Sequence, residues 1–361
     1  MGSEMCIRDR WQQTTTSSDG TVTYSMRAAR REVGGTWSPA RTLRCPGPGD
    51  CAGPRPRLGI DAAGAVTAVW THGETVMTAR HPASGGWSRP RVLATSTSDL
   101  RPSELQLAVA RDGTAVAVWG MNDDAGYAVW AAVRPRGHHW TVPQRLGVGG
   151  HPRVGISPQG VAVLAYYRSP HQMTARFQLA KGWSRPRSLD RGYPSSVAVG
   201  PRGQALLVSE VGSGYRLVAR ESTATGAWQA RTLLHVPVAW DVAPKAVIDA
   251  DGTETVAWSA YTDGAGPNVA WVARKPSGDS WMRSVIGSVD IVFTGDVVQL
   301  FSNRHNDLVV GYSDQIMLRR ADSAWTAPFG GGGAVGILPN GDALRMWWEA
   351  GGLQAQRVHL R

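Results

Sequence analysis

The sequence predicts an all-β fold, a β-propeller of about seven four-stranded antiparallel blades, with eight or six blades as alternatives. One motif, Trp followed usually by Ser or Thr and often by Pro and Leu, recurs at intervals of 43 to 53 residues. Its seven copies begin at Trp37, Trp87, Trp140, Trp183, Trp228, Trp281 and Trp325. A repeat of this length is typical of solenoids and propellers.

A second repeated element lies between the Trp copies. It consists of two alternating apolar strands joined by a tight turn, as in residues 57–70 (RLGIDAAGAVTAVW) and 107–119 (LAVARDGTAVAVW). A glycine ends each turn, and we expect positive φ there, in a two-residue hairpin loop. These glycines are Gly64, Gly113, Gly160, Gly203, Gly252 and Gly341. A third strand follows, and the Trp motif is expected to supply the fourth.

A four-stranded sheet with exposed edges is not stable alone, whereas radial repetition protects those edges. We therefore expect one propeller domain over residues 11–361. Its units are predicted at about 11–43, 56–93, 104–146, 151–189, 195–234, 244–286, 296–329 and 334–361. The first unit lacks its opening strand and the last lacks a Trp motif. Pairing of these partial units would close the ring.

The first ten residues, MGSEMCIRDR, do not fit the repeat and are interpreted as a non-native leader or scar. Of the other cysteines, Cys45 and Cys51 flank the loop CPGPGDC, which a disulfide would close. Disulfides persist in oxidising compartments. We therefore expect the protein to be secreted or on the cell surface.

The formal net charge is +10, and only three of the 38 basic residues are lysines. An acidic partner is one interpretation of this charge. The other is the arginine bias of a high-GC genome, which we prefer because no dense basic segment occurs. We expect no nucleic-acid partner and a monomeric chain. No apolar run approaches the roughly 18 residues of a membrane-spanning helix.

The Trp-Ser-x-Pro and Asp-Gly elements resemble bacterial secreted propellers of the sialidase-like and lectin-like type, over residues 11–361. This resemblance concerns the fold and assigns no catalytic residue. Sialidases would imply repeated Ser-x-Asp-x-Gly-x-x-Trp boxes and an early Arg-Ile-Pro, which are absent from the sequence. A sialidase-like hydrolase with axial carboxylates remains an alternative function.

The loops between second and third strands vary most in length, and they share one end of the blades with the blade-to-blade links. Function usually resides on such variable loops. Most Trp residues are explained by packing between blades. We predict ligand contacts at Trp240 in a link, and at Tyr261 and Tyr127 in or beside the variable loops.

Three other patterns are weaker. Asp249–Glu254 has alternating oxygen ligands around a glycine, as a Ca²⁺ loop does, but its turn role explains the glycine. We expect no cofactor, with Ca²⁺ here as the alternative. His138 and His139 are expected in a solvated loop. Acidic residues near the loops offer pairs for glycoside hydrolysis, and nothing in the sequence selects two of them.

We therefore expect a non-enzymatic propeller that recognises a glycan or protein ligand through one loop face. The alternatives are the hydrolase and a structural or interaction repeat module. Raised-pKa carboxylates in a pocket would favour the enzyme. Exposed aromatic residues would favour a lectin.

Overall fold

The structure is a computed structural model, and every statement below concerns the residues that it describes. These are residues 7–16, 22–31, 41–43, 56–98, 100–168, 172–179, 182–212, 216–229, 232–235, 244–260, 268–289, 298–303, 305–312, 315–321, 323–327, 329–330, 334–337, 343–349 and 352–358. The side chains of residues 7–43 and of most residues beyond 328 lie outside this description.

The chain divides into two compact units, Met1–Arg187 and Ser188–Arg361, which are described separately. The strands of the first unit are β1 (Ile7–Thr16), β2 (Val22–Arg31), β3 (Arg41–Leu43), β4 (Arg57–Ile60), β5 (Val66–His72), β6 (Thr75–His81), β7 (Arg91–Thr95), β8 (Ser103–Val109), β9 (Ala115–Asp123), β10 (Gly126–Arg134), β11 (Gln144–Val148), β12 (Gly150–Ile156), β13 (Ala162–Arg168), β14 (Gln172–Leu179) and β15 (Gly182–Trp183). A further strand, β16 (Arg187–Arg191), begins at the last residue of this unit and pairs with β14.

The strands of the second unit are β17 (Tyr193–Val199), β18 (Ala205–Val211), β19 (Arg216–Ser222), β20 (Thr232–His235), β21 (Lys245–Ile248), β22 (Glu254–Ala260), β23 (Asn268–Lys275), β24 (Met282–Val289), β25 (Val298–Ser302), β26 (Leu308–Tyr312), β27 (Gln315–Arg319), β28 (Phe329–Gly330), β29 (Ala334–Ile337), β30 (Ala343–Glu349) and β31 (Gly352–Val358).

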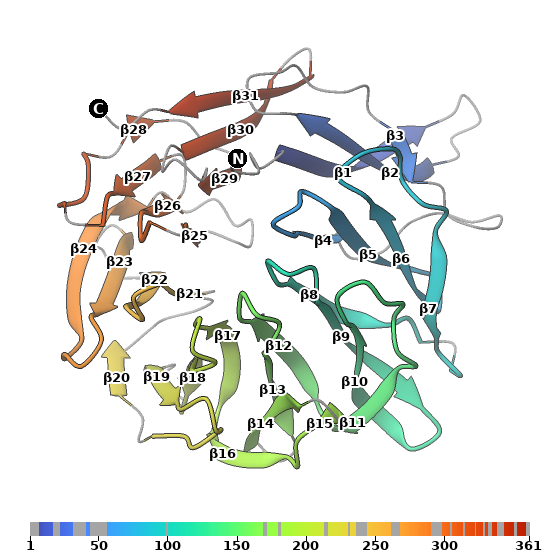
Figure 1. Cartoon of the computed structure of the whole chain (residues 1–361), viewed down its shortest axis with the longest axis horizontal. Helices are drawn as coiled ribbons and strands as arrows, with labels where there is room; N and C mark the ends of the chain where they lie inside the picture. The colour runs from blue at the N-terminus through green and yellow to red at the C-terminus, as the bar shows by residue number, and fades with distance from the viewer. Residues whose placement is uncertain are drawn as a thin grey trace. The chain divides into compact units, whose positions relative to one another are not determined.

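Within each unit, consecutive strands pair antiparallel into separate sheets (Figure 1). In the first unit the opening strands β4, β8 and β12 of neighbouring sheets lie side by side, as do β17, β21, β25 and β29 in the second. The described residues form no helix, so none could cross a membrane as a helix. The predicted all-β architecture of four-stranded antiparallel sheets is confirmed.

The described residues form eight sheets, and the first and last have three strands each. Sheet β1-β2-β3 has no strand before the β1–β2 hairpin, and sheet β29-β30-β31 has none after β31. Strand β1 begins at Ile7, inside the segment that was interpreted as a leader. The number of blades, the closure of the ring and the leader stay predictions.

The turns between first and second strands are longer by one residue than predicted. In the first, the Gly64 amide donates to the Asp61 carbonyl (3.0 Å) and the Asp61 amide donates to the Ala65 carbonyl (3.0 Å). The loop thus has three residues and ends in Gly64 at φ 80°. This combination is a type I turn followed by a left-handed residue, which favours glycine. Asn306, at φ 63°, takes this position in the β25–β26 turn.

In four repeats the residue that follows the motif Trp forms two hydrogen bonds with one residue of the third strand. The Thr141 amide donates to the Val133 carbonyl (2.8 Å), and the Val133 amide donates to the Thr141 hydroxyl (3.1 Å). The same two bonds join Ser88 to Arg80, Ser184 to Phe177, and Thr326 to Leu318. This Trp-Ser/Thr clip explains why Ser or Thr follows Trp in the repeat.

The Trp motif supplies the fourth strand, as predicted. Strands β7, β11 and β16 begin directly after Pro90, Pro143 and Pro186 of the motif. Proline has no amide hydrogen to donate, so regular pairing resumes only beyond it. Trp183 lies in the short strand β15, which pairs with β14.

In several sheets the core is centred on an aromatic residue of the second strand. Trp70, Trp119 and Trp258 are fully buried among alanine, valine and leucine side chains. The motif residues Trp87, Trp140, Trp183, Trp281 and Trp325 are half-buried and pack against the same clusters. For these described residues, the predicted packing role of Trp is confirmed.

We predict that Trp119→Ala lowers the free energy of unfolding by about 3–5 kcal/mol, because it empties a fully buried site. Val142→Ala is the control, since Val142 is 83% exposed and should change little. Urea unfolding followed by tryptophan fluorescence measures both variants. Equal effects would contradict the assigned core.

Candidate functional site

Tyr127 is the one predicted ligand-contact residue that the described part of the chain contains. Trp240 and Tyr261 lie outside the described residues, as do Cys45 and Cys51 of the predicted disulfide. Tyr127 is the second residue of β10, directly after the turn that joins β9 to β10. It therefore lies at the end of the sheet that the variable loops were predicted to occupy.

Two glycines make room for the Tyr127 ring. A Cβ atom at Gly120, on the paired strand β9, would overlap the Tyr127 hydroxyl. A Cβ atom at Gly150, at the start of β12 in the neighbouring sheet, would lie 3.0 Å from the ring. The ring thus fills the space between two sheets of the first unit.

The Tyr127 hydroxyl is hydrogen-bonded to a carboxylate that forms an ion pair with a histidine. It donates to Glu104 Oε2 (2.9 Å) and lies 2.6 Å from the Ser103 hydroxyl. The backbone amide of His151 donates to the same Glu104 oxygen (2.8 Å), and His151 Nδ1 lies 2.8 Å from Glu104 Oε1. Ser103, Glu104, Tyr127 and His151 form the cluster that we call the loop-end site.

Both charged residues of the loop-end site have unusual backbone conformations. Glu104 has φ 54° and His151 has φ 52°, in the left-handed region that non-glycine residues rarely adopt. Each follows the start of an opening strand, where pairing shifts register between Ser103 and Gln106 and between Gly150 and Arg153. Such bulges re-aim side chains and are common beside functional sites.

Hydrogen bonds and charge fix the protonation of the loop-end site. Although burial opposes ionisation, bonds from His151 and Tyr127 lower the pKa of Glu104 to about 2. The hydrogen bond to Glu104 raises the pKa of His151 above its ordinary value. Burial raises the pKa of Tyr127 to about 12. The arrangement therefore holds an anionic carboxylate beside a neutral phenol and favours the cationic form of the imidazole.

These groups are placed to bind a solute. His151 is about half exposed (51%) and Glu104 is 25% exposed, so both can reach a solute. A phenol with a raised pKa is a poor base near neutral pH. They can donate and accept hydrogen bonds in a fixed geometry.

A second group of carboxylates lies in the second unit, at the turn end of its sheets. Burial and the charge of Glu221 raise the pKa of Glu254 to about 8, and burial raises the pKa of Asp249 to about 7. Glu221 Oε2 lies 2.5 Å from Lys275 Nζ, so this carboxylate is already paired with a cation of the chain.

Two other predicted features belong to turns. Asp251 Oδ1 accepts the Thr253 amide (2.8 Å), within the segment considered for Ca²⁺. In the described part of the chain, no three His, Cys, Asp or Glu side chains are grouped to hold a metal ion. His138 and His139 lie exposed in the β10–β11 connection, as predicted.

Sequence reasoning did not select Glu104 or His151. Their signal is a proline beside each, in Pro102-Ser103-Glu104 and Gly150-His151-Pro152, at the start of an opening strand. A similar bulge follows Pro194 in β17, where the Ser195 hydroxyl donates to Glu210 (2.8 Å). In each of these three strands a proline therefore lies at or beside the bulge, and its neighbours are candidate site residues.

Comparison with known proteins defines the fold class. No protein-family model and no curated protein matches the sequence. The structure of the Dos1 propeller matches with a TM-score of 0.56 at 10% identity, over 96% of this chain and 82% of that chain. The polysaccharide lyase Uly1 matches with a TM-score of 0.53 at 11% identity, over 90% and 94% of the two chains.

A fungal lectin from Aleuria aurantia, with a six-bladed β-propeller fold, gives a lower TM-score of 0.43 at 12% identity, over 78% of this chain and 95% of the lectin. The fold assignment depends on the first two matches. Together with the antiparallel sheets, they show that this chain has a β-propeller fold.

We predict a pH-dependent contribution of Glu104 to stability. Its lowered pKa makes the carboxylate stabilising above its ordinary value of 4.5, and this contribution is lost as the pH falls toward 2. The raised pKa of His151 makes the imidazolium stabilising below its ordinary value of 6.5, and this contribution is lost as the pH rises through the folded-state pKa. The destabilisation by Glu104→Gln should therefore be largest between pH 4.5 and 6.5.

The expected size is about 1 kcal/mol, because solvent screens the half-exposed His151. Urea unfolding at several pH values measures it, with Asp124→Asn, an exposed carboxylate of the adjacent turn, as the control. A destabilisation that is independent of pH would contradict the ion pair.

Proposed function

We propose that this chain is a non-enzymatic, carbohydrate-binding β-propeller that holds a saccharide at the loop-end site. The observation that carries the proposal is the exposed His151–Glu104 pair, fixed by Tyr127 between two neighbouring sheets. Saccharide hydroxyls donate and accept hydrogen bonds at once, so a fixed pair of opposite charges can bind two of them.

The fold further supports binding of a saccharide. The polysaccharide lyase Uly1 has this fold, which is thus compatible with a protein that handles a polysaccharide. A hydrolase is the second candidate function, because burial raises the pKa of Glu254 to about 8 and this carboxylate lines a cavity of the second unit together with Glu221.

The proposal extends to features that lie outside the described residues. Trp240 and Tyr261 are proposed as further ligand contacts, because both lie in loops predicted at the same end of the blades. The Cys45–Cys51 disulfide, with secretion or display at the cell surface, is likewise proposed from the sequence. A protein ligand, in place of a saccharide, is an outcome of the test below.

A glycan-array screen of the full chain tests the proposal, with and without Ca²⁺. We expect binding of a defined saccharide, followed by isothermal titration of the best ligand. His151→Ala should weaken that binding about tenfold or more, because it removes a charged hydrogen-bond donor. Tyr127→Phe should weaken it less, since it only releases Glu104 from one hydrogen bond.

His138→Ala is the matched control, because His138 is an exposed histidine outside the site. It should bind like the unchanged chain. Failure to bind any saccharide would overturn the proposal and favour a protein ligand. Binding that is unaffected by His151→Ala and Tyr127→Phe would show that the saccharide binds elsewhere.

A further inference from the structure

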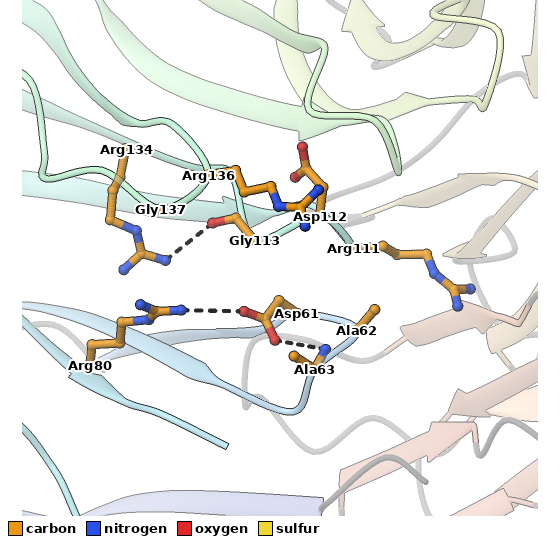
Figure 2. Close-up of a pocket in the computed structure, with 10 residues that line it drawn as sticks. All are labelled: Asp61, Ala62, Ala63, Arg80, Arg111, Asp112, Gly113, Arg134, Arg136 and Gly137. Atoms are coloured by element: carbon orange, nitrogen blue, oxygen red, sulfur yellow. Dashed lines mark hydrogen bonds and ion pairs between the residues drawn. The ribbon is translucent and has the colours of Figure 1, made fainter. Parts of the chain in front are cut away.

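A cavity of about 570 Å³ lies in the first unit, at the opposite end of the sheets from the loop-end site. It is bounded by the β4–β5 turn, the β8–β9 turn and the β10–β11 connection (Figure 2). Strand β8 links the two places, with Glu104 near its start and Arg111 just beyond its end. Seven extended residues separate them by about 20 Å, so the cavity is a distinct site.

The charged residues that line this cavity are mostly arginines. Four of them, Arg80, Arg111, Arg134 and Arg136, face two aspartates, Asp61 and Asp112. We call this cavity the arginine pocket.

The carboxylates of the two aspartates already accept hydrogen bonds within their own turns. Asp61 Oδ1 accepts the amides of Ala63 (3.0 Å) and Ala65 (2.8 Å), and Oδ2 lies 3.7 Å from Arg80. Asp112 accepts the amide (2.8 Å) and the hydroxyl (3.0 Å) of Thr114. Among the described residues, the side chains of Arg111 and Arg136 have no hydrogen-bond or ion-pair partner and are exposed.

Arg134 is a buried cation whose hydrogen bonds go to neutral groups. It is 7% exposed, and its Nη2 donates to the Thr67 hydroxyl (2.7 Å) and, more weakly, to the Gly113 carbonyl (3.4 Å). Its guanidinium carbon lies 5.5 Å from the centre of the Trp140 ring. Burial and the nearby charge of Arg80 lower its pKa to about 10, against the opposing effect of the Asp61 carboxylate. Arg80 lies 3.7 Å from the same carboxylate, so one anion serves two cations.

At the equivalent position in the second unit, a buried cation is paired with an anion of the same chain. Two residues after their turn glycines, Ala115 pairs with Arg134 and Glu254 pairs with Lys275, so the two cations are equivalent. In the preceding sheets, three residues after the turn glycines, Thr67 pairs with Arg80 and Leu206 pairs with Glu221, so Arg80 and Glu221 are equivalent.

Where the second unit has the anion Glu221 beside Lys275, the first unit therefore has the cation Arg80 beside Arg134. Asp61 is the anion that these two arginines share, and the pocket as a whole holds four arginines and two aspartates. An anion from outside the chain would offset this excess of positive charge.

We propose that the arginine pocket binds an oxyanion group, the carboxylate or sulfate of an acidic saccharide. Guanidinium groups bind such anions through paired hydrogen bonds, and this preference is stronger for arginine than for lysine. The pocket is a second site, and its proposal does not depend on saccharide binding at the loop-end site.

Isothermal titration of the full chain at low ionic strength tests this proposal, with inorganic sulfate and a sulfated, uronate-containing heparin disaccharide as probes. Both should bind at one site, and the disaccharide should displace sulfate. Arg136→Ala should weaken binding of each about tenfold, because it removes a charged donor. Arg80→Glu should abolish binding, since it places the anion of the second unit beside Arg134.

Arg202→Ala is the matched control. It removes one exposed arginine from the equivalent cavity of the second unit, so the net charge falls by the same amount as in Arg136→Ala. It should bind both probes like the unchanged chain. Thermal unfolding without ligand should show that Arg80→Glu is folded, because the new carboxylate lies beside Arg134 although it also lies beside Asp61.

Three results would overturn the proposal. The first is no binding of either probe. The second is equal weakening by Arg136→Ala and Arg202→Ala, which would assign the effect to the general charge of +10. The third is sulfate binding that the disaccharide does not displace, which would make the pocket a site for a free inorganic anion.

Discussion

The blades depend on the Trp-Ser/Thr clip. The hydroxyl and amide of one residue bind the third strand from both sides, as Thr141 does at Val133. They hold the chain against this strand at the point where proline prevents regular pairing. The preceding Trp is thereby fixed over the core of the sheet. A short hydroxyl side chain lets the second bond return to the backbone, and it does so at Ser88, Thr141, Ser184 and Thr326. Gln229 takes this place after Trp228 and donates its amide to the Glu221 carbonyl (2.8 Å).

Because the sheets share one strand order, their two ends have different physical roles. One end has short three-residue turns that are nearly identical between repeats, closed by a left-handed glycine or asparagine. The other end has bulges and hairpins of varied length, such as the start of β12 and the β9–β10 hairpin. Variation in backbone geometry is thus concentrated at one end. At the turn end, only side-chain identity varies.

The sequence predicts the repeat, the turns and the buried Trp residues because each is a local pattern. It predicts Tyr127 as a site residue from its position beside a variable loop. It does not predict Glu104 or His151, which are 47 residues apart and meet only where two sheets lie side by side. Their positive φ values also break the rule that reserves such positions for glycine. The arginine pocket could not be predicted from the sequence for a related reason, since Arg80 and Arg134 come from different repeats.

A repeat protein gains a site most easily where one repeat departs from the others at an equivalent position. Lys275 shows that a cation at the end of the third strand is tolerated when Glu221 is its neighbour. In the first unit Arg80 takes the place of that glutamate, and Arg134 stays buried beside it. The fold tolerates this like-charge pair because Thr67 and the Trp140 ring hold the guanidinium. Asp61 offsets part of the repulsion between the two arginines, and an anion that enters the pocket would offset the rest.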